Sequence, residues 1–168
     1  MKKTIKLDLP YPSIEHLEED YKSARIISSA YAGMHSELGA VLQYVYHAFY
    51  FEKAGDEQTA DILDGIAIAE MRHLEILGAT LLKLGADPVF TACPPFKNNF
   101  YNTSKIAYSK TRQKMLLDDL SGEIYASENY GKMLEELTNE QVAAIIARIK
   151  LDEELHIKVL KERLSCYS

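Results

Sequence analysis

Four segments of the chain carry apolar residues at intervals of three and four positions, the spacing that gives an α-helix one apolar face. Three of them span about residues 28–53, 56–84 and 109–137. The fourth begins after Thr138-Asn139-Glu140-Gln141, a sequence typical of a capped helix N-terminus. The pattern therefore predicts an all-α fold, an antiparallel bundle of four long helices.

Ionisable residues interrupt these apolar faces at six positions. Two pairs have the spacing Glu-x-x-His, which places both side chains on one helix face, one turn apart. Two further glutamates stand alone, one in the first segment and one in the third. A carboxylate buried in such a face without a partner costs several kcal/mol or takes up a proton. The six residues are Glu37, Glu70, His73, Glu123, Glu153 and His156.

The segment 85–104 separates the second predicted helix from the third and has no helical period. It contains Pro88, Pro94 and Pro95, and prolines favour an extended chain of roughly 3 Å per residue. A connection of this kind can return the chain to the far end of the bundle, so that the second and third helices run parallel, as in ferritin-like folds. We expect one domain over residues 1–168, with an N-terminal arm over 1–20 and a crossover over 85–104.

The positions of the turns bring the six ionisable residues to one height. Glu37 and Glu70 lie almost equally far from the turn at Gly55, and Glu123 and Glu153 lie equally far from the turn before the fourth helix. Because each residue adds the same rise along a helix, both pairs fall near the middle of the bundle. The spacing is therefore consistent with one central site.

Two metal ions are the natural partners of such a site. Four carboxylates balance two divalent cations, and two imidazoles complete a ligand set that suits iron or manganese better than structural zinc. We expect Glu70 and Glu153 to bridge the two ions, and Glu37 and Glu123 to bind one ion each. The alternative is a plain bundle in which buried polar pairs only fix the register of the helices.

The composition excludes several classes of partner. The formal net charge of −6, without a cluster of Lys or Arg, argues against a nucleic-acid surface. We find no apolar stretch long enough to span a membrane and no signal peptide. The cysteines, Cys93 and Cys166, form neither a CxxC pair nor a disulfide framework. We therefore expect a cytoplasmic protein with free thiols.

Three stretches of the sequence carry a family resemblance: SELGAVLQYVYH around Glu37, AEMRHLEILGATLLKLG around Glu70 and DEELHIKVL around Glu153. With them the chain resembles the ferritin-like di-metal carboxylate proteins, and is most similar to rubrerythrin diiron domains and manganese catalases. The resemblance implies that Tyr44 lies beside the metal ions. It also implies that Asp152 holds a ligand histidine, His73, by a hydrogen bond.

The chain also departs from rubrerythrins. They carry a second glutamate three residues from the first on the third helix, where this chain has Leu120 and Ala126. The absence of CxxC pairs also rules out a rubredoxin domain, so a peroxidase of this type would need an external electron donor such as rubredoxin. Manganese catalases need no donor and have a simpler ligand set, although they are usually longer.

Three functions follow from these observations. The resemblance implies an oxidoreductase that reduces or disproportionates hydrogen peroxide; dioxygen is the alternative small-molecule substrate. The alternative is a ferroxidase that stores iron, as bacterioferritin-like proteins do, and the third is a purely structural bundle. Apolar and aromatic residues outside the ligand stripe, Tyr46, Phe49 and Tyr50, predict an interface and thus a homodimer.

Overall fold

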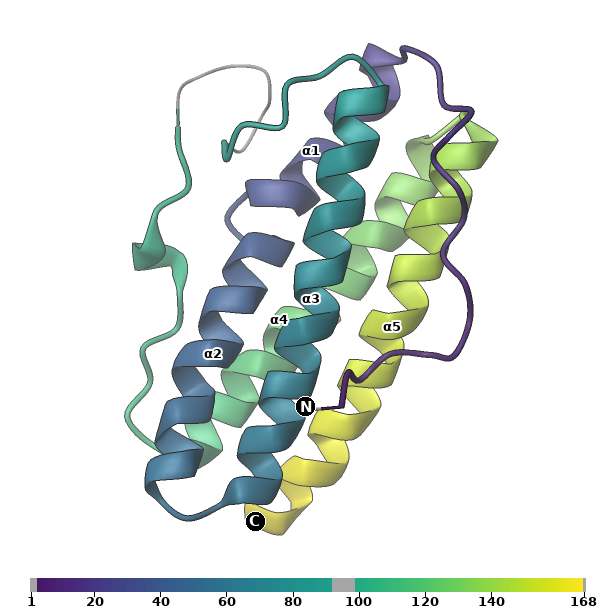
Figure 1. The fold of residues 1–168 in the computed structure, drawn as a ribbon. Helices are drawn as coiled ribbons and strands as arrows, with labels where there is room; N and C mark the ends of the chain where they lie inside the picture. Colours follow the sequence, from purple (N-terminus) through teal and green to yellow (C-terminus); the bar gives the residue numbers. More distant parts are fainter. Residues whose placement is uncertain (1–2, 92–98, 168) are drawn as a thin grey trace.

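The computed structural model describes residues 3–91 and 99–167, so Cys93 and two of the crossover prolines lie outside the described residues. A short helix, α1 (Tyr21–Ala32), precedes four long ones (Figure 1). Within the described ranges there is no strand, only an isolated bridge between Thr91 and Phe100. The predicted all-α fold is thus confirmed. The long helices are α2 (Glu37–Lys53), α3 (Glu57–Lys83), α4 (Arg112–Glu136) and α5 (Glu140–Leu164).

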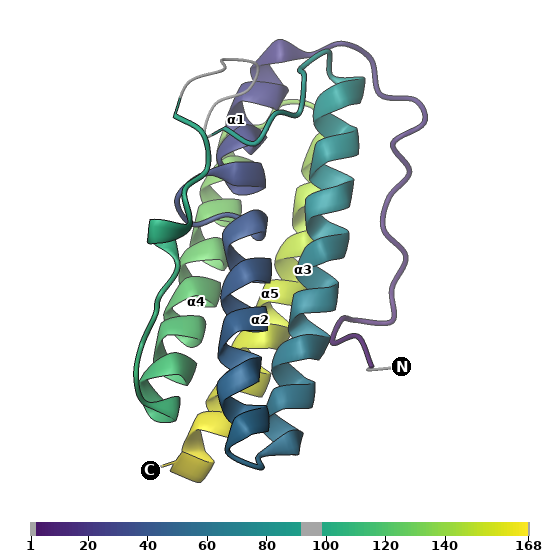
Figure 2. The ribbon, with the colours of Figure 1, turned by 60° about the vertical axis from the view of Figure 1, so that its left-hand side comes forward.

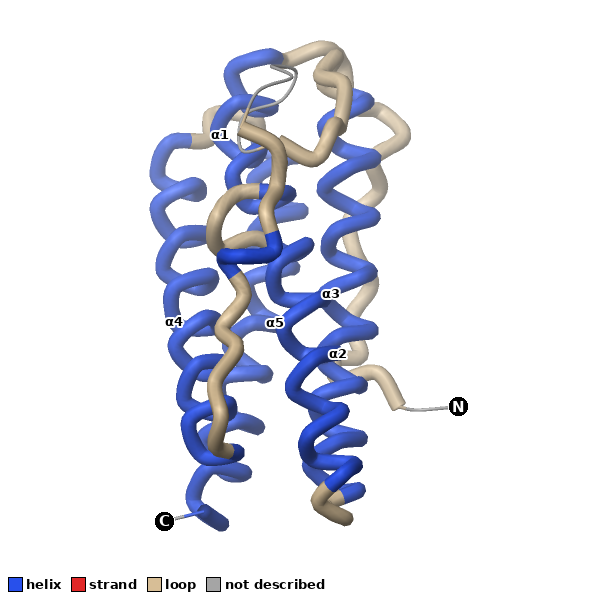
Figure 3. The backbone as a smooth tube through the Cα atoms, turned by 90° about the vertical axis from the view of Figure 1, so that its left-hand side faces the viewer, coloured by secondary structure: helices blue, strands red, loops and turns tan. Residues whose placement is uncertain are grey.

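The helices form two antiparallel hairpins, α2–α3 and α4–α5, joined by the long crossover (Figures 1 and 2). Gly55 turns the first hairpin with a positive φ of 76°, a conformation that glycine adopts readily. The crossover leaves the end of α3, passes the 3₁₀ turn η1 (Thr103–Lys105), and reaches the opposite end of the bundle. Its described part runs along the outside of α2 and α4 (Figure 3). Consequently α3 and α4 run parallel, which is the ferritin-like connection predicted from the sequence.

The first predicted helix, 28–53, is wrong as a continuous element, because the structure divides it into α1 and α2. Gly33 ends α1, and its N–H donates to the carbonyl of Ser29. Ser36 then caps α2 by accepting from Gly39 N. Met34 lies in this break and is 55% exposed, although its spacing from Ala30 and Glu37 continues the apolar face of the predicted helix. The interruption makes Glu37 the first residue of α2, where the helix dipole favours a negative charge.

The helix boundaries differ by a few residues elsewhere. The third helix begins at Arg112, later than the expected residue 109, because Thr111 accepts from Lys114 N and caps it. The turn before α5 is capped by Asn139, whose side chain accepts from the backbone N–H of Gln141 and Val142. Such shifts are common at helix ends and leave the height of the central residues unchanged.

Two apolar clusters fill the bundle, one on each side of a polar central layer. One cluster gathers around Ile27, Leu77 and Ile149, and the other around Phe51 and Leu116. The N-terminal arm crosses the outside of α3 and α5 before α1 begins (Figures 1 and 2). No helix in the described part of the chain is both long and apolar enough to cross a membrane.

Asp56 locks the α2–α3 turn to the end of α5, and its removal should destabilise the fold. It caps α3 by accepting from Thr59 N at 3.1 Å, and Arg163 Nη2 lies 2.9 Å from its Oδ1. Replacement of an N-cap Asp costs about 1 kcal/mol and loss of a half-buried ion pair adds to this. We expect Asp56→Ala to lower the free energy of unfolding by about 2 kcal/mol in urea titrations at pH 7.

The matched control is Glu128→Ala, which removes an exposed acid from the middle of α4 and should change little. Burial opposes ionisation of Asp56, but hydrogen bonds from Tyr167, Thr59 and Arg163 lower its pKa below the usual value. A carboxylate with a lowered pKa stabilises above its unfolded pKa and loses that contribution as the pH falls. The difference between wild type and Asp56→Ala should therefore shrink below about pH 4. Equal stability at pH 7 would contradict this role.

Candidate metal centre

The two Glu-x-x-His pairs lie on facing helices, Glu70 and His73 on α3 and Glu153 and His156 on α5, and all four side chains are buried. Each histidine directs Nδ1 towards the carboxylates. His73 Nδ1 lies 3.1 Å from Glu70 Oε2 and 3.1 Å from Glu153 Oε1. His156 Nδ1 lies 2.8 Å from Glu70 Oε1. The helical spacing thus brings both pairs to one point in the bundle.

The two remaining glutamates reach this point from the other pair of helices. Glu37 Oε2, on α2, is 3.6 Å from His73 Nδ1. Glu123 Oε2, on α4, is 3.4 Å from His156 Nδ1. Both side chains are buried as well. All six residues singled out in the sequence therefore converge.

Two overlapping groups of four side chains result, and within each group the donor atoms lie within 4.8 Å of one another. Glu70 and Glu153 belong to both groups, which is the arrangement that two bridging carboxylates would have. One group is completed by Glu37 and His73, and the other by Glu123 and His156. Each group could hold one metal ion.

Two buried tyrosines hold the lone glutamates across the bundle. Tyr44 on α2 donates a hydrogen bond to Glu123 on α4, and Tyr130 on α4 donates to Glu37 on α2. Each tyrosine follows the glutamate of its own helix by the same interval, two helical turns. The pairing is therefore reciprocal and ties α2 to α4 at the level of the centre.

The electrostatics of the centre reflect mutual repulsion in a dry interior. Burial, together with the charge of Glu70, raises the pKa values of Glu37 and Glu153 well above their usual range. Burial acts against ionisation of Glu70 too, but the hydrogen bond with Glu37 and the two histidines lower its pKa. Burial alone would lower the pKa values of His73 and His156, and the neighbouring carboxylates raise them well above normal instead. Protons thus neutralise the centre when no cation is bound.

Several potential metal-binding atoms at the centre form no well-aligned hydrogen bond, although some of them lie within ion-pair distance of one another. Among the described residues, four buried atoms of this kind belong to the six converging side chains. Leaving a buried polar atom unsatisfied costs about 1–3 kcal/mol, more for a charged group. A cation between the helices would satisfy all of them. These atoms are Glu70 Oε1, Glu123 Oε2, Glu153 Oε1 and His156 Nδ1.

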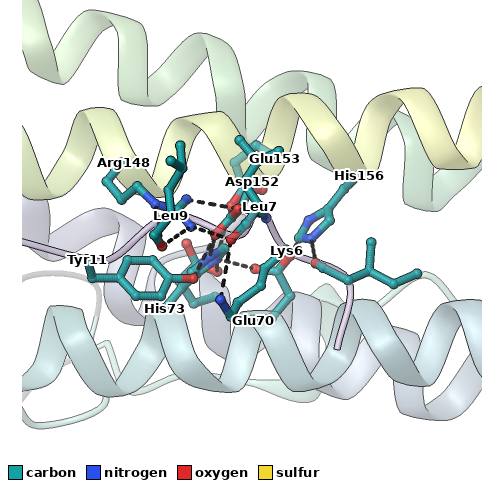
Figure 4. Close-up of polar contacts among 12 residues, drawn as sticks. Lys6, Leu7, Leu9, Tyr11, Glu70, His73, Arg148, Asp152, Glu153 and His156 are labelled. Carbon is teal, nitrogen blue, oxygen red and sulfur yellow. Dashed lines mark hydrogen bonds and ion pairs between the residues drawn. The ribbon is translucent and has the colours of Figure 1, made fainter. Parts of the chain in front are cut away.

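Asp152 supports His73 from outside the centre (Figure 4). Its Oδ2 lies 3.1 Å from His73 Nε2, and its Oδ1 is 2.9 Å from Arg148 Nη1. Tyr11 donates to Oδ2 at 2.6 Å. Burial acts to raise the pKa of Asp152, but these hydrogen bonds and charges lower it below its usual range. A stable carboxylate at this position keeps the Nε2 proton of His73 pointing outward and its Nδ1 free for a cation.

A cavity of about 70 Å³ reaches the centre between α2 and α4. Small residues of the two helices line it, among them Gly39, Ala40, Gly122 and Ala126, and Lys105 of the crossover stands at its wall. This volume accommodates several water-sized molecules. The cavity therefore has room for a small molecule beside the centre.

A second buried polar cluster lies one helical turn from Glu123. Asp119 Oδ1 is 2.8 Å from His47 Nδ1, and Gln43 Nε2 donates to the same oxygen at 2.9 Å. His47 Nε2 is 2.8 Å from the carbonyl of Ala107, which can only accept, so Nε2 carries a proton. Asp119 Oδ2 lacks a partner among the described residues, and Asp119 lines the cavity. The pair holds a proton beside the cavity wall.

Sequence reasoning did not single out several of these residues. Tyr130 is one of them, although its interval from Glu123 repeats that of Tyr44 from Glu37. Asp119 and Arg148 read as ordinary helix charges, since nothing in the pattern shows which charges become buried. Tyr11 lies in the arm, which has no periodicity to interpret. Tyr44 contacts Glu123 and Asp152 contacts His73, as described above.

The comparisons with known proteins agree with this architecture. Residues 31–165 match the ferritin-like domain family. Two solved structures of KatB, a manganese catalase from Anabaena, superpose with a TM-score of 0.79 each and are 21% identical to the chain. Each superposition covers 96% of this chain and 79% of KatB. No curated protein matches the chain significantly in sequence. At this identity KatB shows a common fold, and the family match over most of the chain shows that this protein belongs to the ferritin-like domain family.

Proposed function

We propose that this protein holds two iron or manganese ions among its six central residues and consumes hydrogen peroxide with them. The single observation that carries the proposal is the pair of overlapping donor groups that share Glu70 and Glu153. The unsatisfied donor atoms and the four clustered carboxylates support a total cation charge near +4. KatB, a manganese catalase of the same fold, supports peroxide as the substrate class.

The residues of the chain divide the work in this proposal. Glu37 and His73 would hold one ion, Glu123 and His156 would hold the other, and Glu70 and Glu153 would be shared by both. Two redox-active ions held by these residues would supply two-electron chemistry towards a small oxygen substrate. The cavity between α2 and α4 admits a molecule of the size of peroxide. Asp119, with its proton shared with His47, presents an oxygen that can hydrogen-bond a molecule in the cavity.

The family supports a second candidate, oxidation and storage of ferrous iron, because the chain is a ferritin-like protein. The same six residues would then bind iron as a substrate. Two Glu-x-x-His pairs favour the peroxide reaction, since cage ferritins commonly carry one, although bacterioferritin-like proteins also carry two. The cytoplasmic location remains a prediction for either function.

The metal affinity should depend steeply on pH. The raised pKa values of Glu37, Glu153 and both histidines mean that protons occupy the sites which the metal needs. Raising the pH through these pKa values removes the competing protons, so metal binding should strengthen from pH 6 to pH 8 and release protons. Calorimetric titration with Mn²⁺ in two buffers of different ionisation enthalpy measures both effects.

Variants separate this competition from non-specific binding of metal. His73→Ala and His156→Ala should each lower the metal content below two ions per chain, whereas His16→Ala, which changes an exposed arm residue, should not. Metal binding that stays constant between pH 6 and pH 8 would contradict proton competition at this centre.

Peroxide turnover is the direct test of the function. Metal-loaded protein should consume hydrogen peroxide, with oxygen release and no donor for a catalase, or only with a donor such as reduced rubredoxin for a peroxidase. The double variant Glu70→Gln, Glu153→Gln should lower the rate of peroxide turnover roughly 100-fold or more. This loss exceeds the one typical of a residue that only hydrogen-bonds a metal ligand. Protein that carries two ions per chain and turns over peroxide in neither assay would refute the proposal and favour storage.

The assembly should distinguish the enzyme from a storage cage. We expect a homodimer through α2, where Phe49 is 60% exposed and the rings of Tyr46 and Tyr50 lie 5.2 Å apart at an angle of 59°. Multi-angle light scattering at micromolar concentration should give twice the chain mass, and Phe49→Glu should give the monomer. Leu82→Glu, a matched change at an exposed leucine of α3, should leave the dimer intact. A particle of about two dozen subunits would favour iron storage instead.

A further inference from the structure

We propose that the N-terminal arm, residues 3–11, is a working part of the metal centre. It orients both histidines, and the ion bound by His156 depends on it more than the ion bound by His73. This inference rests on the proposed function only in assuming that the six central residues bind two ions.

The arm is bonded to the seam between α3 and α5 along its length (Figure 4). Ile5 N donates to the carbonyl of Gly65 on α3 at 3.0 Å. On α5, Arg148 Nη2 donates to the carbonyls of Leu7 and Leu9, at 3.0 Å each. These bonds engage backbone atoms of the arm, so they fix its path and not only its side chains.

The arm determines which nitrogen of His156 faces the centre. His156 Nε2 lies 2.8 Å from the carbonyl oxygen of Ile5. A carbonyl only accepts, so Nε2 must carry the proton and donate it. Nδ1 is then the nitrogen that faces Glu70 and Glu123, and a cation that displaces its proton would find the lone pair of this nitrogen directed to the centre. The backbone of Ile5 thus sets both the tautomer and the ring orientation of a metal ligand.

His73 receives the equivalent support from a carboxylate. Its Nε2 faces Asp152 Oδ2 at 3.1 Å. The arm holds this carboxylate in turn, since Leu7 N donates to Oδ1 at 2.8 Å and Tyr11 donates to Oδ2 at 2.6 Å. Arg148 completes the support at 2.9 Å from Oδ1. Asp152 therefore keeps a partner on its own helix if the arm is lost.

The difference between the two histidines has a simple origin in the sequence. Asp152 immediately precedes Glu153 on α5, and it reaches across to His73 on α3. The corresponding position on α3, immediately before Glu70, is Ala69, which is buried and has no polar group. Helix α3 thus offers no carboxylate to His156, and the carbonyl of Ile5 occupies that place.

Gly65 makes room for the arm. A Cβ at this position would lie 2.5 Å from the backbone oxygen of Lys3 and 2.9 Å from Ile5 Cγ1. Neither contact can be tolerated, and the first involves backbone that cannot turn aside. Any side chain at residue 65 must therefore displace the arm, which makes Gly65 the position to change.

The two ions should consequently bind with different affinities. A carboxylate partner increases the basicity of a ligand imidazole more than a neutral carbonyl does, and loss of such outer partners lowers metal affinity about 10–100-fold. His73 has as its partner the carboxylate of Asp152, which both the arm and Arg148 hold. His156 has as its partner the carbonyl of Ile5, which lies on a segment that can be displaced. We expect the His73 position to fill first.

The test is a titration of metal-free protein with Mn²⁺, in which the free ion is counted by electron paramagnetic resonance. Wild type should bind in two steps. Gly65→Ala should weaken the second step about 10-fold or more and change the first by less than about 3-fold. Asp152→Asn should weaken the first step. Gly131→Ala is the matched control, because its Cβ meets nothing closer than Lys150 Cε at 3.9 Å, and it should titrate as wild type.

A measurement on wild type avoids the question whether Gly65→Ala folds normally. Because coupling between two sites is reciprocal, binding of the second ion must stabilise the arm. Hydrogen exchange at Ile5 N, which is bonded to Gly65, should slow when the second equivalent is added. A deletion of residues 2–6 should abolish the second step while the helical content by circular dichroism persists.

The outcomes separate the two proposals. One outcome is that wild type binds two ions while Gly65→Ala and the deletion of residues 2–6 both bind the second ion with unchanged affinity. In that case the arm has no role and the proposed function stands. An equal loss of affinity in both binding steps would also overturn the inference. So would hydrogen exchange at Ile5 N whose rate does not change when the second ion binds. Wild type that binds no metal at all would overturn the proposed function together with this inference.

Discussion

Four carboxylates buried at the centre of a helical bundle form the constraint on which the rest of this structure depends. Each has lost its water, and each raises the energy of the others, because like charges repel strongly in a medium of low polarity. The raised pKa values of Glu37 and Glu153 are the direct result, so protons or cations must neutralise the centre. Helices with only this layer would separate. The apolar clusters on both sides of it hold the four helices at the distance where one cation can contact several carboxylates.

The groups around the four carboxylates and the two histidines mainly restrict the conformations of these side chains, and they do little to neutralise the charge of the centre. Tyr44 and Tyr130 each hold one oxygen of a lone glutamate and leave the other directed to the centre. Glu37 also stands in the first turn of α2, where unpaired backbone N–H groups favour an anion. The pair of Asp152 and Arg148 adds no net charge, so it can hold His73 without adding to the repulsion. Such support keeps the donor atoms in place before any ion arrives, which is the condition for tight binding.

The sequence predicted the four long helices and the six central residues because an amphipathic period repeats over many turns, so that errors at the ends do not move the middle. The break before Glu37 could not be predicted, because an apolar stripe continues in register across a short interruption. The role of the arm could not be predicted at all, since Ile5 and Leu7 act through backbone atoms that any residue possesses. Asp119 is a different case: an acid on a helix reads as exposed until its partner His47, far away in sequence, is placed against it.

The inner residues repeat between the two halves of the bundle, whereas their surroundings do not. Each half supplies one lone glutamate, one tyrosine and one Glu-x-x-His pair. Asp119, however, stands one turn before Glu123, and no helical turn precedes Glu37 to carry a counterpart, because α2 begins there. The same break places Met34 and His35 at the wall of the cavity. The missing turn thus opens the centre on the side of Glu37, while the proton held by Asp119 and His47 stays on the side of Glu123. Two ions with matching ligands would therefore differ in access, in nearby protons and in the partner of their histidine, and they would react differently with a molecule in the cavity.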